Sequence, residues 1–366
     1  MSAERYLARM MRVSAGLAAR GIDAAVVGPS PDLVYLSGYD PMPTERATLL
    51  IVRAEGDPFM IVPELERPLA VSSPVGSAFD LLGWVDGRDP YREAAKVLEG
   101  AALIVVGDRL WSSHLLGLQI ALPMAVITSA SDVIGAVRSV KDPEELDSLR
   151  LAGAAADRAF EEVCGLRFEG RTERDVAADL GRLLLDHGHA RVDFTIVASG
   201  PNGASPHHAP TDRTIGANEP VVLDFGGTLD AYCSDTTRTV VVGEPSPAFQ
   251  EVYEVVRRAQ TAACEVVRPG AMAQEIDRVA RAIINDAGHA DRFIHRTGHG
   301  IGLEVHEPPY IMEGNETRLR AGMTFSVEPG VYLPGAYGVR IEDIVAVTSD
   351  GVERFNRSDR ALRVVA

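Results

Sequence analysis

The sequence contains few cysteines and no long uninterrupted hydrophobic run. Its 366 residues include three cysteines: Cys164, Cys233 and Cys264. An odd number without a C-x-x-C pair argues against a disulfide framework and favours a reducing compartment. The longest apolar stretch, residues 115–127, is interrupted by a glutamine and a proline and is too short to cross a bilayer. These absences predict a cytoplasmic protein without a membrane span.

Basic residues are scarce relative to acidic ones. The chain has 36 Lys and Arg against 52 Asp and Glu, a formal net charge of −16 at pH 7. A surface of this sign is a poor partner for nucleic acid or for an acidic membrane. Residues 1–21 carry charges throughout an amphipathic pattern, which predicts a surface helix rather than a signal peptide.

The length of the chain suits two domains. From residue 23 to about residue 140, strand-like and helix-like segments alternate, which is typical of an α/β domain with a mixed sheet. In the following segment, KDPEE, Asp142 is a candidate N-cap and Pro143 suits the first helical position. We therefore expect a first domain at residues 1–140 and a second at residues 141–366.

The second domain has the pattern of an α+β domain. Helical spacing predicts helices at residues 143–164, 172–185, 248–268 and 273–288. A strand at 193–199, a loop to about residue 214 and a hairpin separate the two helix pairs, and the end of the chain is rich in strand-like segments.

Two carboxylates lie inside the apolar pattern of the predicted hairpin, VVLDFGGTLDAYCSDTTRTVV at residues 221–241. Asp224 follows a buried strand, Gly226-Gly227 is a turn signal, and Asp235 belongs to a second strand. Two ionised carboxylates buried without a compensating cation would cost several kcal/mol each, as an order of magnitude. The sequence therefore predicts a positive group between Asp224 and Asp235.

Three further residues lie on or beside strand-like runs near the end of the chain. They are His299 in RTGHGIG, Glu328 in FSVEPGVYL and Glu342 in YGVRIEDIVAV. Four carboxylates and one imidazole would suit divalent Mn²⁺, Co²⁺ or Zn²⁺ better than Ca²⁺, because of the histidine. Two such ions, about 3.5 Å apart, can share a bridging water and activate it at neutral pH.

Each of these acids taken alone is an ordinary turn, cap or ion-pair residue, but their order carries more information. Five motifs follow one another along the chain in a fixed order: DFGG, SDTTRT, TGHGIGLEVHE, FSVEPGVY and YGVRIED. This series resembles the metallopeptidases with the pita-bread fold: methionine aminopeptidases, aminopeptidase P and the Xaa-Pro dipeptidases, or prolidases. The resemblance implies that Asp224 binds one metal ion, that His299 and Glu328 bind the other, and that Asp235 and Glu342 bridge the two.

The same resemblance carries expectations for the rest of the molecule. It implies an RNase-H-like N-terminal domain of the creatinase/prolidase type and a pita-bread catalytic domain with two structurally related halves. A homodimer is expected.

Two other motif assignments do not fit the sequence. GHGIG has the wrong glycine spacing for a dinucleotide loop, and Pro308-Pro309 breaks the helix that a zincin motif at His306-Glu307 would need.

Peptide hydrolysis needs an activated water, a group that stabilises the tetrahedral oxyanion, and a proton for the leaving nitrogen. Glu328 is the expected proton shuttle. By the resemblance His207, in SGPNGASPHHAP, and His306, in GLEVHEPP, contact the substrate and stabilise the transition state without binding metal. Arg340 shares a strand face with Glu342 and is expected to orient a ligand carboxylate such as Asp224 and to take part in substrate binding.

The resemblance also suggests a substrate class. Members similar to this two-domain form cleave the bond before proline, and those that act on dipeptides usually hold the terminal carboxylate with an arginine shortly after the second histidine. Here Pro309 and Tyr310 occupy that stretch, so Tyr310 is the expected substrate contact. Its hydroxyl offers one hydrogen bond, whereas an arginine would offer a charged pair of N–H donors.

The leading hypothesis is a manganese-dependent dipeptidase that cleaves Xaa-Pro dipeptides. The first alternative is an aminopeptidase P that acts on longer Xaa-Pro-Yaa peptides. A metal-free hydrolase of a non-peptide C–N bond, as in creatine amidinohydrolases, or an inactive binding paralogue is disfavoured, because such relatives usually lack the full ligand set.

Overall fold

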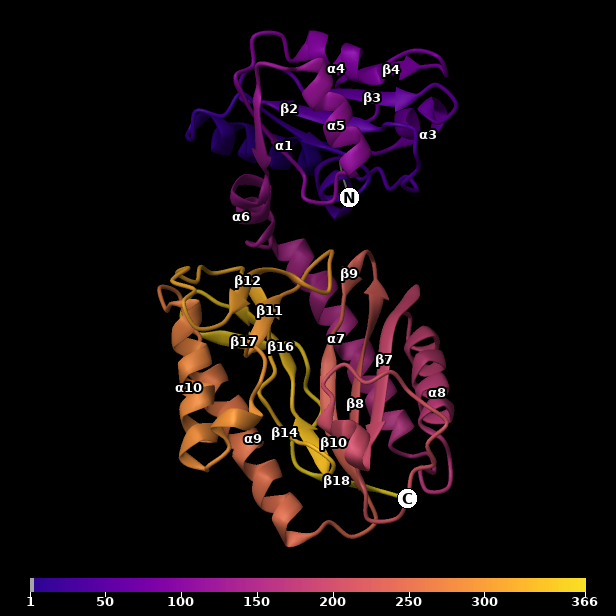
Figure 1. Cartoon of the computed structure of the whole chain (residues 1–366), viewed down its shortest axis with the longest axis vertical. Coiled ribbons are helices and arrows are strands. Elements are labelled where there is room, and N and C mark those ends of the chain that lie inside the picture. The colour runs from indigo at the N-terminus through magenta and orange to yellow at the C-terminus, as the bar shows by residue number, and fades with distance from the viewer. Residues whose placement is uncertain (1–2) are drawn as a thin grey trace. The chain divides into compact units, whose positions relative to one another are not determined.

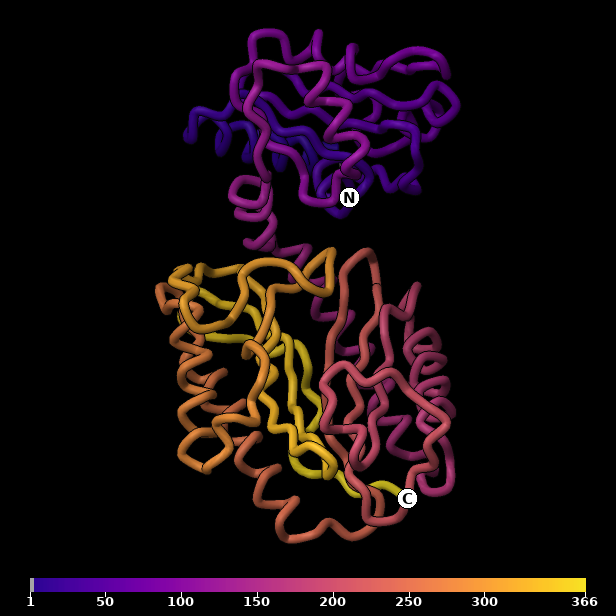
Figure 2. The backbone as a smooth tube through the Cα atoms, viewed as in Figure 1, coloured from indigo at the N-terminus to yellow at the C-terminus, as the bar shows by residue number. Residues whose placement is uncertain are grey.

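The structure is a computed structural model that describes residues 3–366. They form two compact units, one ending at Arg138 and the other comprising Ser139–Ala366. Each unit has its own hydrophobic core, and the tube in Figure 2 follows the chain from one to the other in sequence order. None of the helices in the described residues combines the length and apolar character that a bilayer span requires.

The first unit is built on a mixed sheet of six strands in the order β4-β3-β2-β1-β5-β6. Strand β1 pairs antiparallel with β2 and parallel with β5. The strands are β1 (Ala24–Val27), β2 (Leu49–Arg53), β3 (Phe59–Pro63), β4 (Asp80–Trp84), β5 (Leu103–Val106) and β6 (Val126–Ser129). The helices are α1 (Ala3–Ala18), α2 (Pro31–Ser37), α3 (Arg67–Ser72), α4 (Pro90–Val97), α5 (Ser112–Ala121) and α6 (Ala136–Arg138), with a π-helical turn at Ser131–Gly135. The predicted α/β fold with a mixed sheet is confirmed.

Sequence patterning missed α3 and β4, and the reason is physical. Strand β4 lies at the edge of the sheet and buries only Trp84 fully, so its residues show neither an apolar run nor clean alternation. Helix α3 has six residues and only Ala70 is buried. Both elements are held by their neighbours rather than by their own sequence pattern.

The second unit contains four long helices and three sheets. The helices are α7 (Pro143–Val163), α8 (Glu173–Asp186), α9 (Pro247–Glu265) and α10 (Ala273–Asp286), with 3₁₀ turns at Gly200–Ala204 and Ala290–Arg292. One sheet has the order β18-β10-β8-β7 with β9 added to β8, the second has the order β12-β11-β13-β16-β17, and β14 and β15 form a separate hairpin. The strands are β7 (Arg191–Ser199), β8 (Pro220–Leu229), β9 (Tyr232–Cys233), β10 (Thr236–Val242), β11 (Gly298–Gly300), β12 (Glu307–Ile311), β13 (Thr324–Val327), β14 (Gly330–Leu333), β15 (Tyr337–Arg340), β16 (Asp343–Val347), β17 (Val352–Arg354) and β18 (Arg363–Val365).

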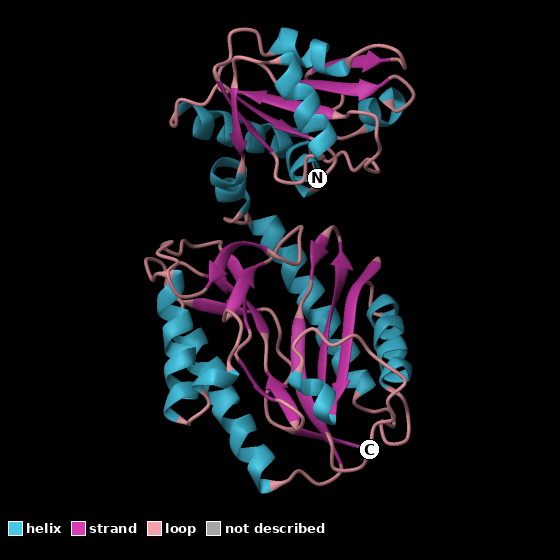
Figure 3. Ribbon diagram, in the orientation of Figure 1, coloured by secondary structure: helices cyan, strands magenta, loops and turns pink. Residues whose placement is uncertain are grey.

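Two helix pairs enclose the strands of the second unit. In Figures 1 and 3, α7 and α8 lie on one side of the strands, and α9 and α10 lie on the other. Apolar faces of α7 and α8 pack on β7, β8 and β10, and those of α9 and α10 pack on β13 to β16. Each fully buried aliphatic or aromatic side chain contributes about 1.5–3 kcal/mol, so the two cores hold the sheets in place.

Local sequence explains where the first helix of this unit begins. The Asp142 side chain accepts a hydrogen bond from the Glu145 backbone N–H, and the Glu145 side chain accepts one from the Asp142 N–H. This reciprocal capping box, with Pro143 at the first helical position, satisfies backbone donors that a helix N-terminus leaves unpaired.

The hairpin turn of the predicted carboxylate strands is displaced from its expected position. Gly226 and Gly227 lie inside β8, and the turn is at Asp230 and Ala231, whose φ angles are 49° and 68°. Gly226 serves close packing instead, because a Cβ there would overlap the Ser234 carbonyl oxygen. The prediction of a glycine turn was therefore wrong, although the hairpin itself is present.

Gly298 is a second position of close approach, one residue before His299. A Cβ on Gly298 would overlap the backbone oxygen of Ser326, so Gly298→Ala must push β11 away from β13. We expect this substitution to lower the free energy of unfolding by about 1–3 kcal/mol, the usual cost of overpacking. The matched control is Gly181→Ala, since Gly181 lies inside α8 and its added Cβ would make only ordinary contacts of 3.8 Å or more. Urea unfolding should show equal or greater stability for the control; equal effects of both substitutions would contradict the close approach of β11 and β13.

Candidate metal centre

The five residues expected to bind metal come from both five-stranded sheets of the second unit. Asp224 lies within β8, and His299 is the middle residue of β11. The other three occupy breaks between strands: Asp235 between β9 and β10, Glu328 between β13 and β14, and Glu342 between β15 and β16. A strand break releases a side chain from the regular alternation of faces, so each carboxylate turns towards the same point.

Backbone hydrogen bonds fix two of these breaks. The Glu328 N–H donates to the Thr297 carbonyl over 2.8 Å, and the Glu342 N–H donates to the Thr237 carbonyl over 3.0 Å. The Thr237 hydroxyl also donates to the Glu342 carboxylate over 2.6 Å. Glu328 is thereby tied to the segment that carries His299, and Glu342 to the strand that follows Asp235.

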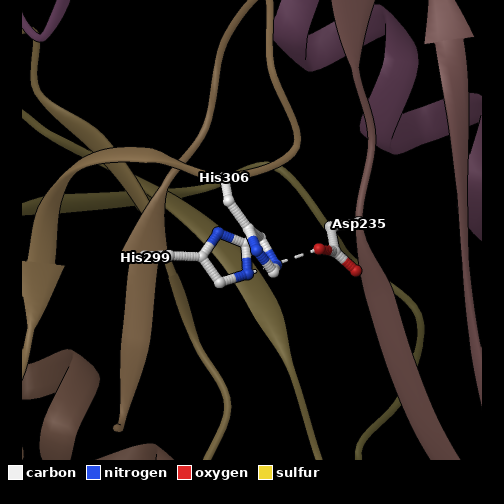
Figure 4. Close-up of side chains that lie close together, drawn as sticks. All are labelled: Asp235, His299 and His306. Carbon is white, nitrogen blue, oxygen red and sulfur yellow. Dashed lines mark ion pairs between the residues drawn. The ribbon is translucent and has the colours of Figure 1, made fainter. Parts of the chain in front are cut away.

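The structure brings all five side chains into overlapping groups. Ligand atoms lie within 4.8 Å of one another in the group of Asp224, Asp235 and Glu342 and in the group of His299, Glu328 and Glu342. A third group contains Asp235, His299 and His306, which Figure 4 shows side by side. The rings of His299 and His306 have centroids 3.9 Å apart. His306 was expected beside this cluster as a substrate contact and not as a metal ligand.

The tautomer of His299 directs a lone pair at the carboxylates. Its Nδ1 lies 3.1 Å from the Gly300 carbonyl oxygen and must carry the proton that this hydrogen bond needs. Its Nε2 lies 3.3 Å from Glu328 Oε1 and 3.5 Å from Asp235 Oδ2. Burial, reinforced by His306, lowers the pKa of His299 to about 3, so at neutral pH the ring is uncharged. Acceptors then face acceptors, and a cation or a proton between them is required for attraction.

Burial makes this requirement strict. Asp224, Asp235, His299 and Glu342 are 2–8% exposed, and the Glu328 side chain is 15% exposed. One carboxylate oxygen of each of three residues, Asp224 Oδ1, Asp235 Oδ1 and Glu342 Oε1, is buried without a hydrogen-bond partner. Such orphaned oxygens are rare in folded proteins and indicate an ion or ligand. The donor set, oxygen-rich with one imidazole, fits divalent metal ions.

The pKa values of the carboxyl groups also show that negative charge is unfavourable in this cluster. Burial raises the pKa of Asp235 well above its ordinary value, and the charges of Glu342 and Asp224 raise it further. Burial and the charge of Glu328 do the same for Glu342. Burial, with Asp224, raises the pKa of Glu328 to about 7. Without added positive charge the cluster holds protons at neutral pH.

Arg340 supplies part of the positive charge, as expected from its strand position. Its Nη2 donates to Asp224 Oδ2 over 2.6 Å, its Nε donates to the Thr237 hydroxyl, and its Nη1 donates to the Tyr332 hydroxyl. Within residues 3–366 it is the only Arg or Lys in an ion pair with any of the four carboxylates. One guanidinium cannot neutralise four carboxylates, so the remaining negative charge favours the binding of divalent ions.

The cluster forms one wall of a cavity of about 520 Å³. His207, His306 and Arg340 also line it, together with three residues that sequence reasoning did not single out: Asp193, His295 and Arg296. Tyr310, expected to touch the substrate, is not among the lining residues; its ring lies 4.3 Å from the Arg296 guanidinium carbon. His295 and Arg296 directly precede the TGHG motif, which contains the expected metal ligand His299. This position was the one sign in the sequence that they would lie near the cavity.

A buried carboxylate positions the loop that carries His207. Glu173, which is fully buried, accepts hydrogen bonds from the backbone or side chains of Ser199, Asn202, His208 and Thr211. Burial alone would raise its pKa, but these hydrogen bonds outweigh that effect and lower the pKa to about 2. Because His208 is held by Glu173, its neighbour His207 faces the cavity.

A second buried pair fixes the segment after His306. Lys141 Nζ lies 2.5 Å from Glu307 Oε1, and both side chains are almost completely buried. Glu307 begins β12, so the pair ties this strand to the residues that precede α7. His306 therefore extends into the cavity from an anchored backbone.

Comparison with known proteins relates both units to described families. A family model described as "Metallopeptidase family M24" matches residues 147–349, and one described as "Creatinase/Prolidase N-terminal domain" matches residues 9–140. The chain is 44% identical to "Probable dipeptidase PepE" of Mycobacterium tuberculosis, over 99% of this chain and 97% of that protein. It is 40% identical to an Xaa-Pro dipeptidase of Lactobacillus helveticus, over 94% of this chain and 95% of that protein. The crystal structure of dipeptidase PepE from Mycobacterium ulcerans matches with a TM-score of 0.97 and 44% identity, covering 100% of this chain and 99% of that one.

Replacing Glu173 should destabilise the second unit. In Glu173→Ala, buried donors from four residues lose their acceptor, and each unsatisfied buried donor costs about 1–3 kcal/mol. We expect urea unfolding to show a loss of at least about 3 kcal/mol. The exposed Glu169→Ala is the matched control and should change stability by less than about 0.5 kcal/mol. A similar small effect for Glu173→Ala would show that its hydrogen bonds do not hold the His207 loop.

Chelation should destabilise the protein more at higher pH. A carboxyl whose folded-state pKa is raised stabilises the fold below its ordinary pKa and loses that contribution as the pH rises through the raised value. For Glu328 this window runs from its ordinary value to about pH 7, and Asp235 and Glu342 shift in the same direction. The difference in Tm between Mn²⁺-loaded and chelated protein should therefore widen between pH 5 and pH 7.5.

Differential scanning fluorimetry at several pH values measures this difference. Glu342→Gln removes one of the repelling charges and should reduce the difference in Tm between Mn²⁺-loaded and chelated protein. A Tm difference that does not depend on pH would contradict the raised pKa values.

Proposed function

The chain belongs to metallopeptidase family M24, and on that premise we propose that it hydrolyses the Xaa-Pro bond of Xaa-Pro dipeptides with the help of two divalent metal ions. The observation that carries the proposal is the set of orphaned, buried oxygens on Asp224, Asp235 and Glu342. The substrate class is supported by the relatives named dipeptidase and Xaa-Pro dipeptidase, which match nearly the whole chain.

We propose that five residues hold the ions. Asp224 would bind one ion, His299 and Glu328 the other, and Asp235 and Glu342 both. In support, Glu342 shares one group with Asp224 and another with His299 and Glu328, and Asp235 shares one group with Asp224 and another with His299. Bound divalent ions supply Lewis acidity, which polarises a carbonyl group and lowers the pKa of water.

The chain's own groups supply the proton transfers. Glu328 lines the cavity beside the metal cluster, where it accepts a proton from the attacking water and returns it to the prolyl nitrogen as the C–N bond breaks. Its carboxylate accepts a hydrogen bond from the Ser326 hydroxyl over 3.2 Å, which restrains the side chain.

His207 and His306 bind the substrate on the open side of the cavity. Burial, followed by the charge of Arg296, lowers the pKa of His306, so it is a neutral ring that donates one N–H. Such a donor stabilises negative charge on the scissile carbonyl oxygen as the tetrahedral intermediate forms. Arg340 lines the same cavity and holds Asp224 in place.

We further propose that Mn²⁺ is the working metal and that the protein is a cytoplasmic homodimer. The donor set of carboxylates with one histidine supports Mn²⁺, with Co²⁺ and Zn²⁺ as substitutes. All three cysteines are buried and unpaired, which supports a reducing compartment. The alternative activity, aminopeptidase P action on longer peptides, is favoured by the placement of Tyr310 outside the cavity lining.

A peptide-length series with metal content determined on the same sample tests the proposal. Protein loaded with Mn²⁺ should hydrolyse a Xaa-Pro dipeptide at least about tenfold more efficiently than the matching Xaa-Pro-Yaa tripeptide. Preference for the tripeptide would favour the aminopeptidase alternative. No hydrolysis of either peptide would refute the proposal.

A matched pair of variants connects activity to the ions. Asp235→Asn should lower kcat/KM by about 10³-fold or more and reduce the bound metal. Asp193→Asn is the control, because Asp193 lines the same cavity but accepts hydrogen bonds from Arg191 and Thr228, and it should retain the metal.

A further inference from the structure

One arginine of the cavity lining forms no ion pair among the described residues. Arg296 lines the cavity, yet within residues 3–366 its guanidinium forms no ion pair and no hydrogen bond. The other arginine of the lining, Arg340, is committed, because it pairs with Asp224. An unpaired guanidinium facing a half-enclosed cavity is a ready site for an anion.

The guanidinium is held in position although it has no polar partner. It lies over the Tyr310 ring, with 4.3 Å between its central carbon and the ring centroid. Cation–π contacts of this kind stabilise the arginine without using its N–H donors. Tyr310 is the register partner of His299 across β11 and β12, so this platform is tied to the metal cluster.

The backbone at Arg296 is fixed as well. His295 Nδ1 lies 2.7 Å from the Arg296 carbonyl oxygen, and His295 Nε2 lies 2.8 Å from the Tyr332 hydroxyl. The Tyr332 hydroxyl in turn accepts a hydrogen bond from Arg340, which pairs with Asp224. A continuous chain of hydrogen bonds therefore sets the distance from the Asp224 end of the cluster to Arg296.

The guanidinium is also close to the reacting groups. Its charge lowers the pKa of His306 and opposes the rise in the pKa of Glu328. In a Xaa-Pro dipeptide the carboxylate carbon lies only about 4 Å from the scissile carbonyl carbon, because three bonds separate them. An anion site for the C-terminus of a dipeptide must therefore lie in the same cavity as the metal cluster, as Arg296 does.

We propose that Arg296, supported by the ring of Tyr310, binds the free C-terminal carboxylate of the dipeptide substrate and so selects dipeptides over longer peptides. The inference rests on the proposed Xaa-Pro hydrolysis and names the residue that sets its substrate length. Tyr310 acts as a positioning residue, and its hydroxyl is not needed. A substrate with a further residue replaces the carboxylate by a neutral amide and loses the paired charge.

The test compares a Xaa-Pro dipeptide with its C-terminal amide, which keeps the scissile bond and removes the negative charge. Wild-type protein should have a kcat/KM at least about tenfold higher for the acid, and Arg296→Gln should reduce that ratio to about one by raising KM for the acid about 10- to 100-fold. Arg296→Lys should give an intermediate ratio, since lysine keeps the charge but not the fork. Tyr310→Phe should keep the wild-type ratio.

Arg292→Gln is the matched control. Arg292 lies four residues earlier, is exposed and does not line the cavity, so this variant should behave as the wild type does. Inhibition by L-proline and by L-prolinamide gives a second readout that does not depend on turnover of the amide. Only L-proline should lose affinity in Arg296→Gln, with metal content unchanged.

Three outcomes would overturn the inference. In Arg296→Gln, they are an unchanged ratio of acid to amide, an equal loss for both substrates, and unchanged inhibition by L-proline. If Arg296→Gln does not fold, Arg296→Lys replaces it in the test. A wild-type ratio of acid to amide in Arg296→Lys would also overturn the inference. Failure of the proposed function is distinct, because it would show as no hydrolysis of acid, amide or tripeptide by the wild type.

Discussion

Mutual repulsion among four buried carboxylates is the constraint on which the second unit depends. Asp224, Asp235, Glu328 and Glu342 approach one another closely enough to share ligands, and the adjacent imidazole of His299 presents a lone pair rather than a proton. Burial in a medium of low polarity makes uncompensated charge expensive. The fold is consistent only if cations, or protons when cations are absent, occupy the centre.

Hydrogen bonds from the surrounding residues hold the carboxylates in that arrangement. Arg340 and Thr237 restrain Asp224 and Glu342, and Ser326 joins Glu328 to the backbone of His299. Farther out, Glu173 organises the His207 loop. Two helix pairs and their cores support the sheets, so the breaks that release Asp235, Glu328 and Glu342 occur between rigid strands. Catalysis by such a site depends on this preorganisation, since ligands and proton carriers need no rearrangement when substrate binds.

Much of this could be predicted from the sequence, because the ligand motifs are local. Short patterns such as TGHG and VEPG place His299 and Glu328 beside strands, and the capping segment before α7 marks where the second unit begins. The roles of Glu173 and Arg296 could not be predicted, since their contacts with Ser199, Thr211 and the ring of Tyr310 form only in the folded chain. The displaced hairpin turn has the same origin: Gly226 is required by a cross-strand contact that no local pattern shows.

Anomalous scattering from crystals grown with Mn²⁺ tests the central claim most directly. Two peaks per chain are expected inside the carboxylate cluster, with Asp235 and Glu342 contacting both and His299 contacting one. Crystals that diffract well but show no peak there, or show ions only elsewhere on the protein, would contradict it.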